Sequence, residues 1–434
     1  MTNSSSTHPS SGGTRSARGV SWLIGPALVA GVAYLDPGNV ASNMTAGAQY
    51  GYLLVWVVVL GNVLAWLIQY LSAKLGVVTG RSLPETLGDR IRRPWARRAY
   101  WVQAELVAMA TDVAEVIGGA VALYLLFGVP LLWGGLITGA VSIALLVVQS
   151  RGGAKPFEFV IIGLIVVIAL GFTYGTFLGP PEPRDVAGGL LPRFADTGSV
   201  LLATSILGAT IMPHAIYAHS ALARDRFAAR TSPAAGTGSP QAPLEHARGI
   251  STRRLLRATR WDVTVAMLIA GTINLSILLL AATNLSGVPG TDTLEGAYTA
   301  LRDGIGPTVA TLFAVGLLAS GLASASVGAY AGAEIMRGLL RVRVPLLARR
   351  LVTLLPALAI LALGFDPTLA LVLSQVVLSF GIPFALIPLV ALSANAEVLG
   401  PFRNRLATTI AGIVASVFLV ALNAVLLWLV FTGA

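Results

Sequence analysis

Long apolar stretches recur along the whole of this 434-residue chain, and this repetition limits its possible fold more than any other feature. Hydrophobic residues make up 55% of the sequence and charged residues only 11%. About 20 apolar residues suffice to cross the hydrocarbon core of a bilayer as a helix, which satisfies its own backbone hydrogen bonds there. The sequence therefore predicts an all-α polytopic membrane protein.

Hydropathy separates the chain into eleven candidate spans. Their approximate bounds are 22–48, 51–76, 100–126, 128–149, 156–178, 199–222, 261–285, 305–335, 347–364, 367–395 and 405–432. Arginines concentrate in alternate loops, so the net charge of +10 indicates topology rather than nucleic-acid binding. The positive-inside rule then places the N-terminus in the cytoplasm and the C-terminus outside. We expect a cell-membrane protein surrounded by the lipid bilayer, with no nucleic acid and no obligatory protein partner.

The loop after the sixth span is rich in Ser, Gly and Pro, which is typical of a flexible linker. It divides the spans into five, five and one. Because five is odd, the second unit starts from the opposite side of the membrane, the pattern of an inverted repeat. The predicted organisation is a disordered cytoplasmic tail (1–20), a first repeat (21–179), an extracellular loop (180–198), a second repeat (199–396) containing the linker (223–258), and a last helix (397–434).

The first span is interrupted by Asp36-Pro37-Gly38-Asn39. A carboxylate in mid-membrane costs about 2.5–3.5 kcal/mol even on the lenient insertion scale, and Pro and Gly disturb the helical hydrogen bonds beside it. A broken helix is tolerated at membrane depth where the freed backbone groups line a cavity or bind a ligand. We expect an unwound turn, flanked by oxygen donors from Asp36 and Asn39, that binds a cation.

The sixth span, which opens the second repeat, contains a matching interruption at Met212-Pro213-His214. Pro213 has no N–H to donate to the Ala209 carbonyl, so that carbonyl is free to face a ligand. The Met212 thioether is a soft donor that suits late divalent transition metals and offers little to Mg²⁺ or Ca²⁺. The alternative for Met212 is ordinary core packing.

Other ionisable groups at membrane depth are typical of a proton path. His214 and His219 are the only histidines inside spans, and we assign the first to proton transfer and the second to a structural or secondary relay role. Glu105, Asp112 and Glu115 share one face of the third span, because they are separated by seven and three residues.

The partner and the role of Glu105 stay open at this level. Glu105 has possible partners in Arg349 and Arg350, either as a static ion pair or as a gate that breaks when the inner side opens. Acidic residues near span ends have simpler interpretations. We expect Glu85 and Asp89 to be solvated partners for arginines, and Glu158, Asp262 and Glu334 to snorkel or cap loops.

The paired motifs Asp36-Pro-Gly-Asn39 and Met212-Pro-His214 resemble those of the natural resistance-associated macrophage protein (Nramp) family, proton-coupled importers of divalent metals with a LeuT-type fold. The resemblance implies helices 1 and 6 broken, metal coordination by Asp36, Asn39, Met212 and the Ala209 carbonyl, and proton exit through Asp112 and Glu115. Gln375 resembles the position that joins the metal shell when the outer side is closed. The similarity extends to Leu71-Ser-Ala-Lys-Leu75, Gly80-Arg-Ser-Leu-Pro-Glu85, Ala110-Thr-Asp-Val-Ala-Glu115 and Ser374-Gln-Val-Val-Leu-Ser-Phe-Gly-Ile-Pro-Phe384.

We therefore expect a secondary active importer of Mn²⁺ or Fe²⁺ coupled to protons, not an enzyme, and with no cofactor. An ion-coupled amino-acid-type symporter of the same fold would not need Asp36 or Met212, and a Mg²⁺ carrier of a related branch would be poorly served by a thioether. A passive channel is disfavoured by the paired breaks. An intramembrane metalloprotease would need a His-Glu-x-x-His helix or an equivalent ligand set, which the sequence lacks.

Overall fold

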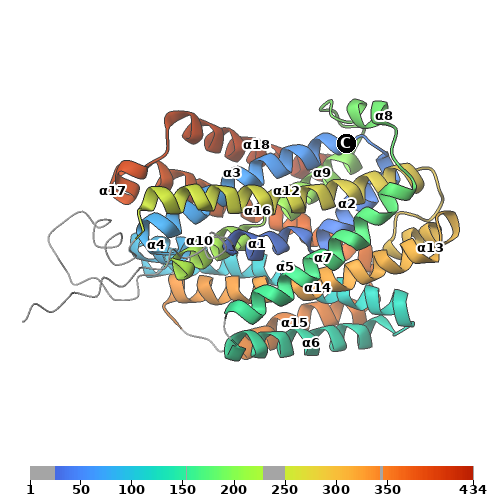
Figure 1. Ribbon diagram of the computed structural model, residues 1–434, viewed down its shortest axis with the longest axis horizontal. Coiled ribbons are helices and arrows are strands. Elements are labelled where there is room, and N and C mark those ends of the chain that lie inside the picture. Colours follow the sequence, from blue (N-terminus) through green and yellow to red (C-terminus); the bar gives the residue numbers. More distant parts are fainter. Residues whose placement is uncertain (1–24, 153, 228–249, 343–345, 434) are drawn as a thin grey trace, which may run out of the picture.

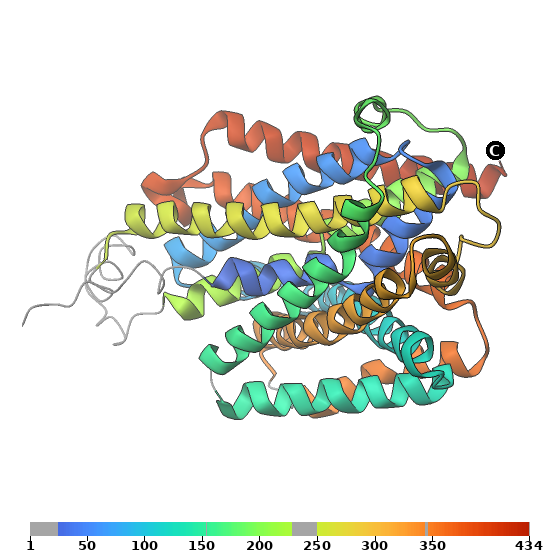
Figure 2. The same cartoon turned by 45° about the vertical axis from the view of Figure 1, so that its right-hand side comes forward.

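The computed structural model describes residues 25–152, 154–227, 250–342 and 346–433, and every regular element in these ranges is helical. The long helices run roughly side by side, with α4 and α17 at one end and α8 and α13 at the other (Figures 1 and 2). The elements are α1 (Pro26–Gly31), η2 (Val32–Leu35), α2 (Pro37–Tyr50), α3 (Val55–Thr79), α4 (Leu83–Arg90), α5 (Pro94–Phe127), α6 (Leu131–Gly152), α7 (Ala154–Leu178), α8 (Pro183–Gly188), α9 (Thr197–Thr210), α10 (Pro213–Arg226), α12 (Thr252–Asn284), α13 (Leu294–Gly304), α14 (Pro307–Ile335), η3 (Met336–Leu340), α15 (Leu346–Ala362), α16 (Pro367–Ala394), α17 (Ala396–Leu399), η4 (Gly400–Phe402) and α18 (Leu406–Thr432).

Both predicted helix breaks are present. The first lies at Asp36, which has extended backbone angles (φ −70°, ψ 162°) between η2 and α2. The second lies at Ile211 and Met212, between α9 and α10. Each second half begins with a proline, whose fixed φ and missing N–H suit the first helical position. The predicted unwound turn from Asp36 to Asn39 is shorter than expected, because Pro37, Gly38 and Asn39 already form the first turn of α2.

The two broken helices pack against each other in opposite directions. The first half of one (α1) contacts the second half of the other (α10), and α2 contacts α9. This crossed pairing brings the two breaks to the same depth of the bundle. It is the arrangement that an inverted repeat produces. The helices α3, α5, α12, α14 and α16 pack around this pair.

Eight helices of the described chain are long and apolar enough to cross a membrane, counting α9 and α10 together as one. Shorter apolar helices cover Pro26–Leu35 and Leu131–Leu145. Each of the eleven candidate spans coincides with a helix or a broken helix, but the count of eleven membrane crossings stays a prediction. Loops that are rich in arginine, including those after α3 and α14, meet at the end of the bundle where α4 and α17 lie (Figure 1).

Sequence hydropathy missed the short helices in loops. The helix α4 lies in the loop between α3 and α5, which hydropathy alone leaves unstructured. A capping box in which Ser82 and Glu85 exchange hydrogen bonds fixes its start. The expected linker 223–258 is shorter than predicted, because α10 continues to Arg226 and α12 starts at Thr252; its middle, 228–249, lies outside the described residues, as does the predicted tail 1–20. The helices α8 and α13 occupy parts of the loops on the opposite side.

Candidate metal site at the crossing of two broken helices

Asp36 lies at the centre of the first break and is fully buried. Its Oδ1 accepts a hydrogen bond from the Asn39 backbone N–H at 2.8 Å, so the carboxylate caps the N-terminus of α2. Its Oδ2 accepts from Gln375 Nε2 at 3.1 Å. A carboxylate at a helix N-terminus is favoured by the helix dipole, which partly offsets the cost of burying a charge.

The carbonyl groups freed at the first break are held by side chains from three helices. The Tyr34 carbonyl accepts from Asn39 Nδ2 at 2.6 Å and from Asn274 Nδ2 of α12 at 3.0 Å. The Leu35 carbonyl accepts from the Ser320 hydroxyl of α14. Neither Asn274 nor Ser320 was predicted from the sequence; the signal available for Asn274 was an amide inside an otherwise apolar stretch.

The second break places a carbonyl beside Asn39, and Met212 at the start of α10. Asn39 Nδ2 lies 3.4 Å from the Ala209 carbonyl, the group that Pro213 leaves without its helical donor. Met212 is fully buried and occupies the position just before α10. The structure thus brings Asp36, Asn39 and the Ala209 carbonyl together as predicted, and places Met212 at the adjacent helix start.

Gln375 reaches the site from α16 because glycines let the helix backbones approach. A Cβ added at Gly38 would lie 1.7 Å from Gln375 Nε2, and one at Gly208 would lie 2.0 Å from the Gln375 carbonyl oxygen. Both positions therefore require glycine in this arrangement. Gln375 Oε1 is buried without a hydrogen-bond partner, which leaves an acceptor free beside Asp36. The part of the chain that the structure describes has no cluster of three His, Asp or Glu suited to a metal, so a cation here depends on mixed donors.

The two histidines have different surroundings. His214 Nδ1 lies 3.1 Å from the Thr111 hydroxyl of α5, one residue before Asp112. His219 Nδ1 lies 2.6 Å from Gln69 Oε1, and Gln69 in turn contacts the Tyr34 hydroxyl. The Nε2 atom of each ring is buried without a hydrogen-bond partner. His214 therefore contacts α5 at the residue before Asp112, and His219 is linked through Gln69 to Tyr34 at the first break.

The carboxylates of α5 form a buried ionic cluster with two arginines of α15. Arg349 Nε pairs with Glu105 Oε1 at 2.9 Å, the first of the two predicted pairings. Arg350, the alternative partner considered for Glu105, contacts Asp112 and Glu115 instead, with Glu115 Oε2 at 3.1 Å from Nη1. Asp112 and Glu115 lie about two and three helical turns beyond Glu105 along α5, and each end of this row of carboxylates is paired with a different arginine of α15.

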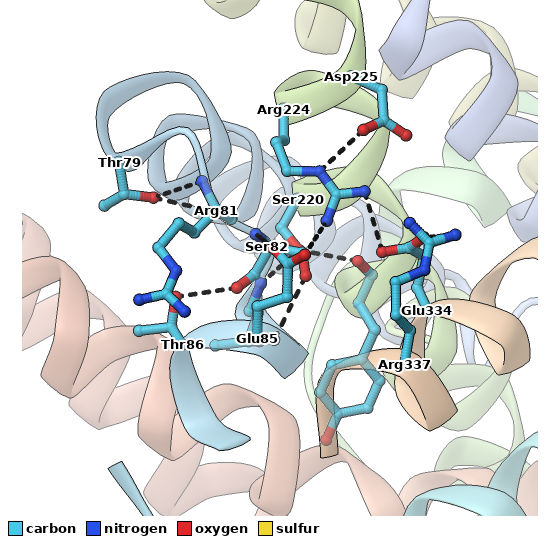
Figure 3. A network of polar contacts seen from close by, with 12 residues as sticks. Thr79, Arg81, Ser82, Glu85, Thr86, Ser220, Arg224, Asp225, Glu334 and Arg337 are labelled. Atoms are coloured by element: carbon cyan, nitrogen blue, oxygen red, sulfur yellow. Dashed lines mark hydrogen bonds and ion pairs between the residues drawn. The ribbon is translucent and has the colours of Figure 1, made fainter. Parts of the chain in front are cut away.

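A second ionic network closes the arginine-rich end of the bundle (Figure 3). Arg224 of α10 pairs with Glu85 of α4 at 2.7 Å and with Glu334 of α14 at 3.0 Å. It also contacts Asp225, and Arg337 pairs with Glu334. Partial burial alone would raise the pKa of Glu85, but the Ser82 backbone N–H and the Arg224 guanidinium hold that pKa below its usual value. Glu85 is therefore ionised at neutral pH.

This network corrects two expectations for acidic residues. Glu334 does not snorkel toward water, because it is only 1% exposed and holds two arginines. Glu85 has the expected arginine partner, Arg224 of α10, but its side chain is partly buried rather than solvated. Asp89 pairs with Arg81 and Arg341 and is exposed, as expected. Asp262 accepts hydrogen bonds from the Gly25 and Ala27 backbone N–H groups, which matches its expected capping role. The side chain of Glu158 lies outside the described residues.

The chain is similar in sequence to one protein family over most of its length. A family model described as natural resistance-associated macrophage protein-like matches residues 27–429. The divalent metal cation transporter MntH of Mycobacterium tuberculosis is 60% identical over 421 residues, covering 97% of this chain and 94% of that protein. The divalent metal cation transporter MntH of Bacillus subtilis is 43% identical over 419 residues, covering 96% of this chain and 94% of that protein.

Solved structures show the same fold. A manganese transporter of Eremococcus coleocola superposes with a TM-score of 0.79 at 31% identity, covering 94% of this chain and 86% of that one. MhsT, solved in complex with L-phenylalanine, superposes with a TM-score of 0.59 at 14% identity, covering 92% of this chain and 98% of that one, which is a likeness of fold alone.

Proposed function

Because this chain belongs to the Nramp family, we propose that it imports divalent transition metal ions of the Mn²⁺ and Fe²⁺ class. The observation that carries the proposal is the meeting of both helix breaks at one buried carboxylate, Asp36, with a thioether at the second break. The names of the relatives support the substrate class. The chain is a transporter and not an enzyme.

The metal ligands are Asp36, Asn39, Met212, Gln375 and the Ala209 carbonyl. Asp36 supplies the negative charge, and the neutral donors complete a shell without a second carboxylate. The amide nitrogen of Asn39 faces the Ala209 carbonyl, so metal binding requires this amide to turn over and present its oxygen. The free Oε1 of Gln375 supports a similar turn of that side chain. Met212 adds the soft donor that favours Mn²⁺ or Fe²⁺ over Mg²⁺.

Protons leave the site along α5. Asp36 exchanges a proton for the metal, and His214 connects the metal site to Thr111 and thereby to the carboxylates Asp112 and Glu115. Buried Arg350 supplies the positive charge that stabilises these two carboxylates at membrane depth. His219 belongs to a separate branch through Gln69 and has the secondary role. Glu105 and Arg349 form the part of the same ionic cluster that lies nearer the arginine-rich start of α5.

The arginine-rich end faces the cytoplasm by the positive-inside rule, with the N-terminus inside and the C-terminus outside. Asp36 and Met212 are fully buried, so the site is closed on both sides in this structure. Opening toward the cytoplasm requires α10 to separate from α14 and α4. The Arg224 pairs with Glu334 and Glu85 hold these elements together and must break in that step (Figure 3).

Replacing Glu334 by Gln is expected to favour cytoplasmic opening, since it removes a buried charge from Arg224 without changing the side-chain shape. The chain has no cysteine, so one placed at buried Ala30 of α1 reports opening through its labelling by N-ethylmaleimide. We expect about tenfold faster labelling in E334Q, which corresponds to about 1.4 kcal/mol. Asp303→Asn, in an exposed pair at the other end, serves as the control. Equal labelling rates in E334Q and the control would rule out this network as the cytoplasmic closure.

Uptake into proteoliposomes tests the proposed function. The purified protein is reconstituted, and Mn²⁺ entry is followed at external pH 5.5 and 7.5 with the interior held at pH 7.5. Proton coupling predicts faster Mn²⁺ entry at the acidic external pH, together with acidification of the interior. Absence of Mn²⁺ entry by a correctly folded protein, with uptake of an amino acid in its place, would favour the symporter alternative.

A further inference from the structure

The helix α18 lies outside the two five-helix repeats, yet it carries one amide in an otherwise apolar helix. Its sequence from Leu406 to Thr432 contains no charged residue, and Asn423 is its only amide. Asn423 lies on the buried stripe of α18 together with Ser416, Leu419 and Leu426, and it is 5% exposed. The helix packs mainly against α16, the helix that carries Gln375.

Two hydrogen bonds join Asn423 to Ser379 of α16. Asn423 Nδ2 donates to the Ser379 carbonyl at 3.1 Å, and the Ser379 hydroxyl donates to Asn423 Oδ1 at 2.9 Å. The Ser379 carbonyl needs this donor, because its helical partner would be the residue four positions later, which is Pro383. In the membrane no water replaces a missing donor there. We call this pair of bonds the Asn423–Ser379 clasp.

The clasp lies one helical turn from Gln375. Residues 375 and 379 are joined through the backbone of the same helix, and on its other side the Gln375 carbonyl is packed against Gly208 of α9. Two residues beyond Ser379, a Cβ added at Gly381 would lie 3.2 Å from Pro213 Cγ of the second break. The segment 375–383 is therefore held between both broken helices on one side and α18 on the other.

We propose that Asn423 is a positioning residue for metal binding. It supplies the donor that Pro383 removes, and so fixes the path of α16 that brings the Gln375 amide to Asp36. Without Asn423, the Ser379 carbonyl must find another donor, which bends α16 and moves Gln375 away from the metal. This inference rests on the proposed metal site, in which Gln375 is a ligand.

The test measures Mn²⁺ affinity of the purified protein by calorimetry, together with KM and kcat of Mn²⁺ uptake. For Asn423→Ala we expect about three- to tenfold weaker binding and a matching rise in KM, the size of one interhelical hydrogen bond in a membrane. The matched control is Ser416→Ala, on the same stripe of α18, whose hydroxyl donates to the Gly412 carbonyl of its own helix. Ser379→Ala removes one bond of the clasp and should give a smaller shift in the same direction.

Two double variants separate positioning from a loss of packing. In a Gln375→Ala background, Asn423→Ala should have no further effect on Mn²⁺ affinity. Pro383→Ala restores a backbone N–H for the Ser379 carbonyl, so P383A combined with N423A should bind Mn²⁺ more tightly than N423A alone. Equal affinities of N423A and S416A, or additive effects of N423A and Q375A, would overturn the proposal. If Q375A alone leaves Mn²⁺ affinity unchanged, the proposed metal site itself fails.

Discussion

Replacing Asp36 by Asn is expected to reduce Mn²⁺ uptake at least about 100-fold. Asp36 is the only acidic residue between Pro26 and Tyr50, and it supplies the only negative charge among the proposed ligands. Losing a buried charged partner costs about 3–5 kcal/mol, and every 1.4 kcal/mol is tenfold in affinity. Uptake of Mn²⁺ into proteoliposomes measures the effect.

The control for this variant is Asp303→Asn, which removes an exposed carboxylate in a surface pair with Arg302. It should transport like the parent protein. The fold of D36N should be retained, because an Asn side chain still accepts hydrogen bonds at the start of α2. Transport by D36N within about threefold of the parent would contradict the assignment of Asp36 as the central ligand.

Replacing Arg350 by Met is expected to lower the free energy of unfolding by about 3–5 kcal/mol. The Arg350 side chain is fully buried and compensates Asp112 and Glu115, while its Nε donates to the Ser142 hydroxyl. Methionine fills similar space but leaves buried Glu115 without a counter-charge, and Asp112 with only the more distant Arg349 Nη1 at 3.7 Å. Unfolding by SDS in mixed micelles, followed by tryptophan fluorescence, measures the change.

Arg302→Met is the matched control for the arginine, since Arg302 forms an exposed pair and should change stability by less than about 1 kcal/mol. Adding Asp112→Asn and Glu115→Gln to R350M should restore most of the lost stability, because no uncompensated charge remains. An R350M protein as stable as the R302M protein would show that the cluster is not the ionic centre described here.

The breaks could be predicted from sequence because their causes are local. Pro37 and Pro213 each disfavour the helical conformation of the residue before them, and each leaves the carbonyl four residues back without its helical donor. The same reasoning identified the Ala209 carbonyl. Hydropathy found the long helices for a similar reason, since a span of 20 apolar residues is a property of one segment.

Long-range partners could not be predicted in the same way. Asn274 holds the Tyr34 carbonyl from a helix 240 positions away in the sequence, and no local signal pairs them. Arg349 and Arg350 are adjacent, so the sequence does not specify which of them faces Glu105; the rotation of α15 against α5 decides it. Glu334 was expected to snorkel or cap a loop, because the sequence does not show the ion pair with Arg224 of α10 that accompanies its burial.

The short helices show a further limit. The residues of α4 are too polar for a hydropathy window, and its stability depends on the Ser82–Glu85 capping box and on close packing against η3, where a Cβ at Gly88 would lie 2.0 Å from the Gly338 carbonyl oxygen. Capping signals identify such a start, but only packing shows that α4 lies beside Arg224.

The most direct test of the metal site at the crossing of the two breaks is Mn²⁺ uptake in excess Mg²⁺ by the parent protein and by Met212→Ala. The account predicts that the parent takes up Mn²⁺ despite Mg²⁺, because the thioether of Met212 binds the softer ion more strongly. In M212A, Mg²⁺ should compete with Mn²⁺. A variant that still discriminates against Mg²⁺ as well as the parent does would contradict the placement of Met212 in the metal shell.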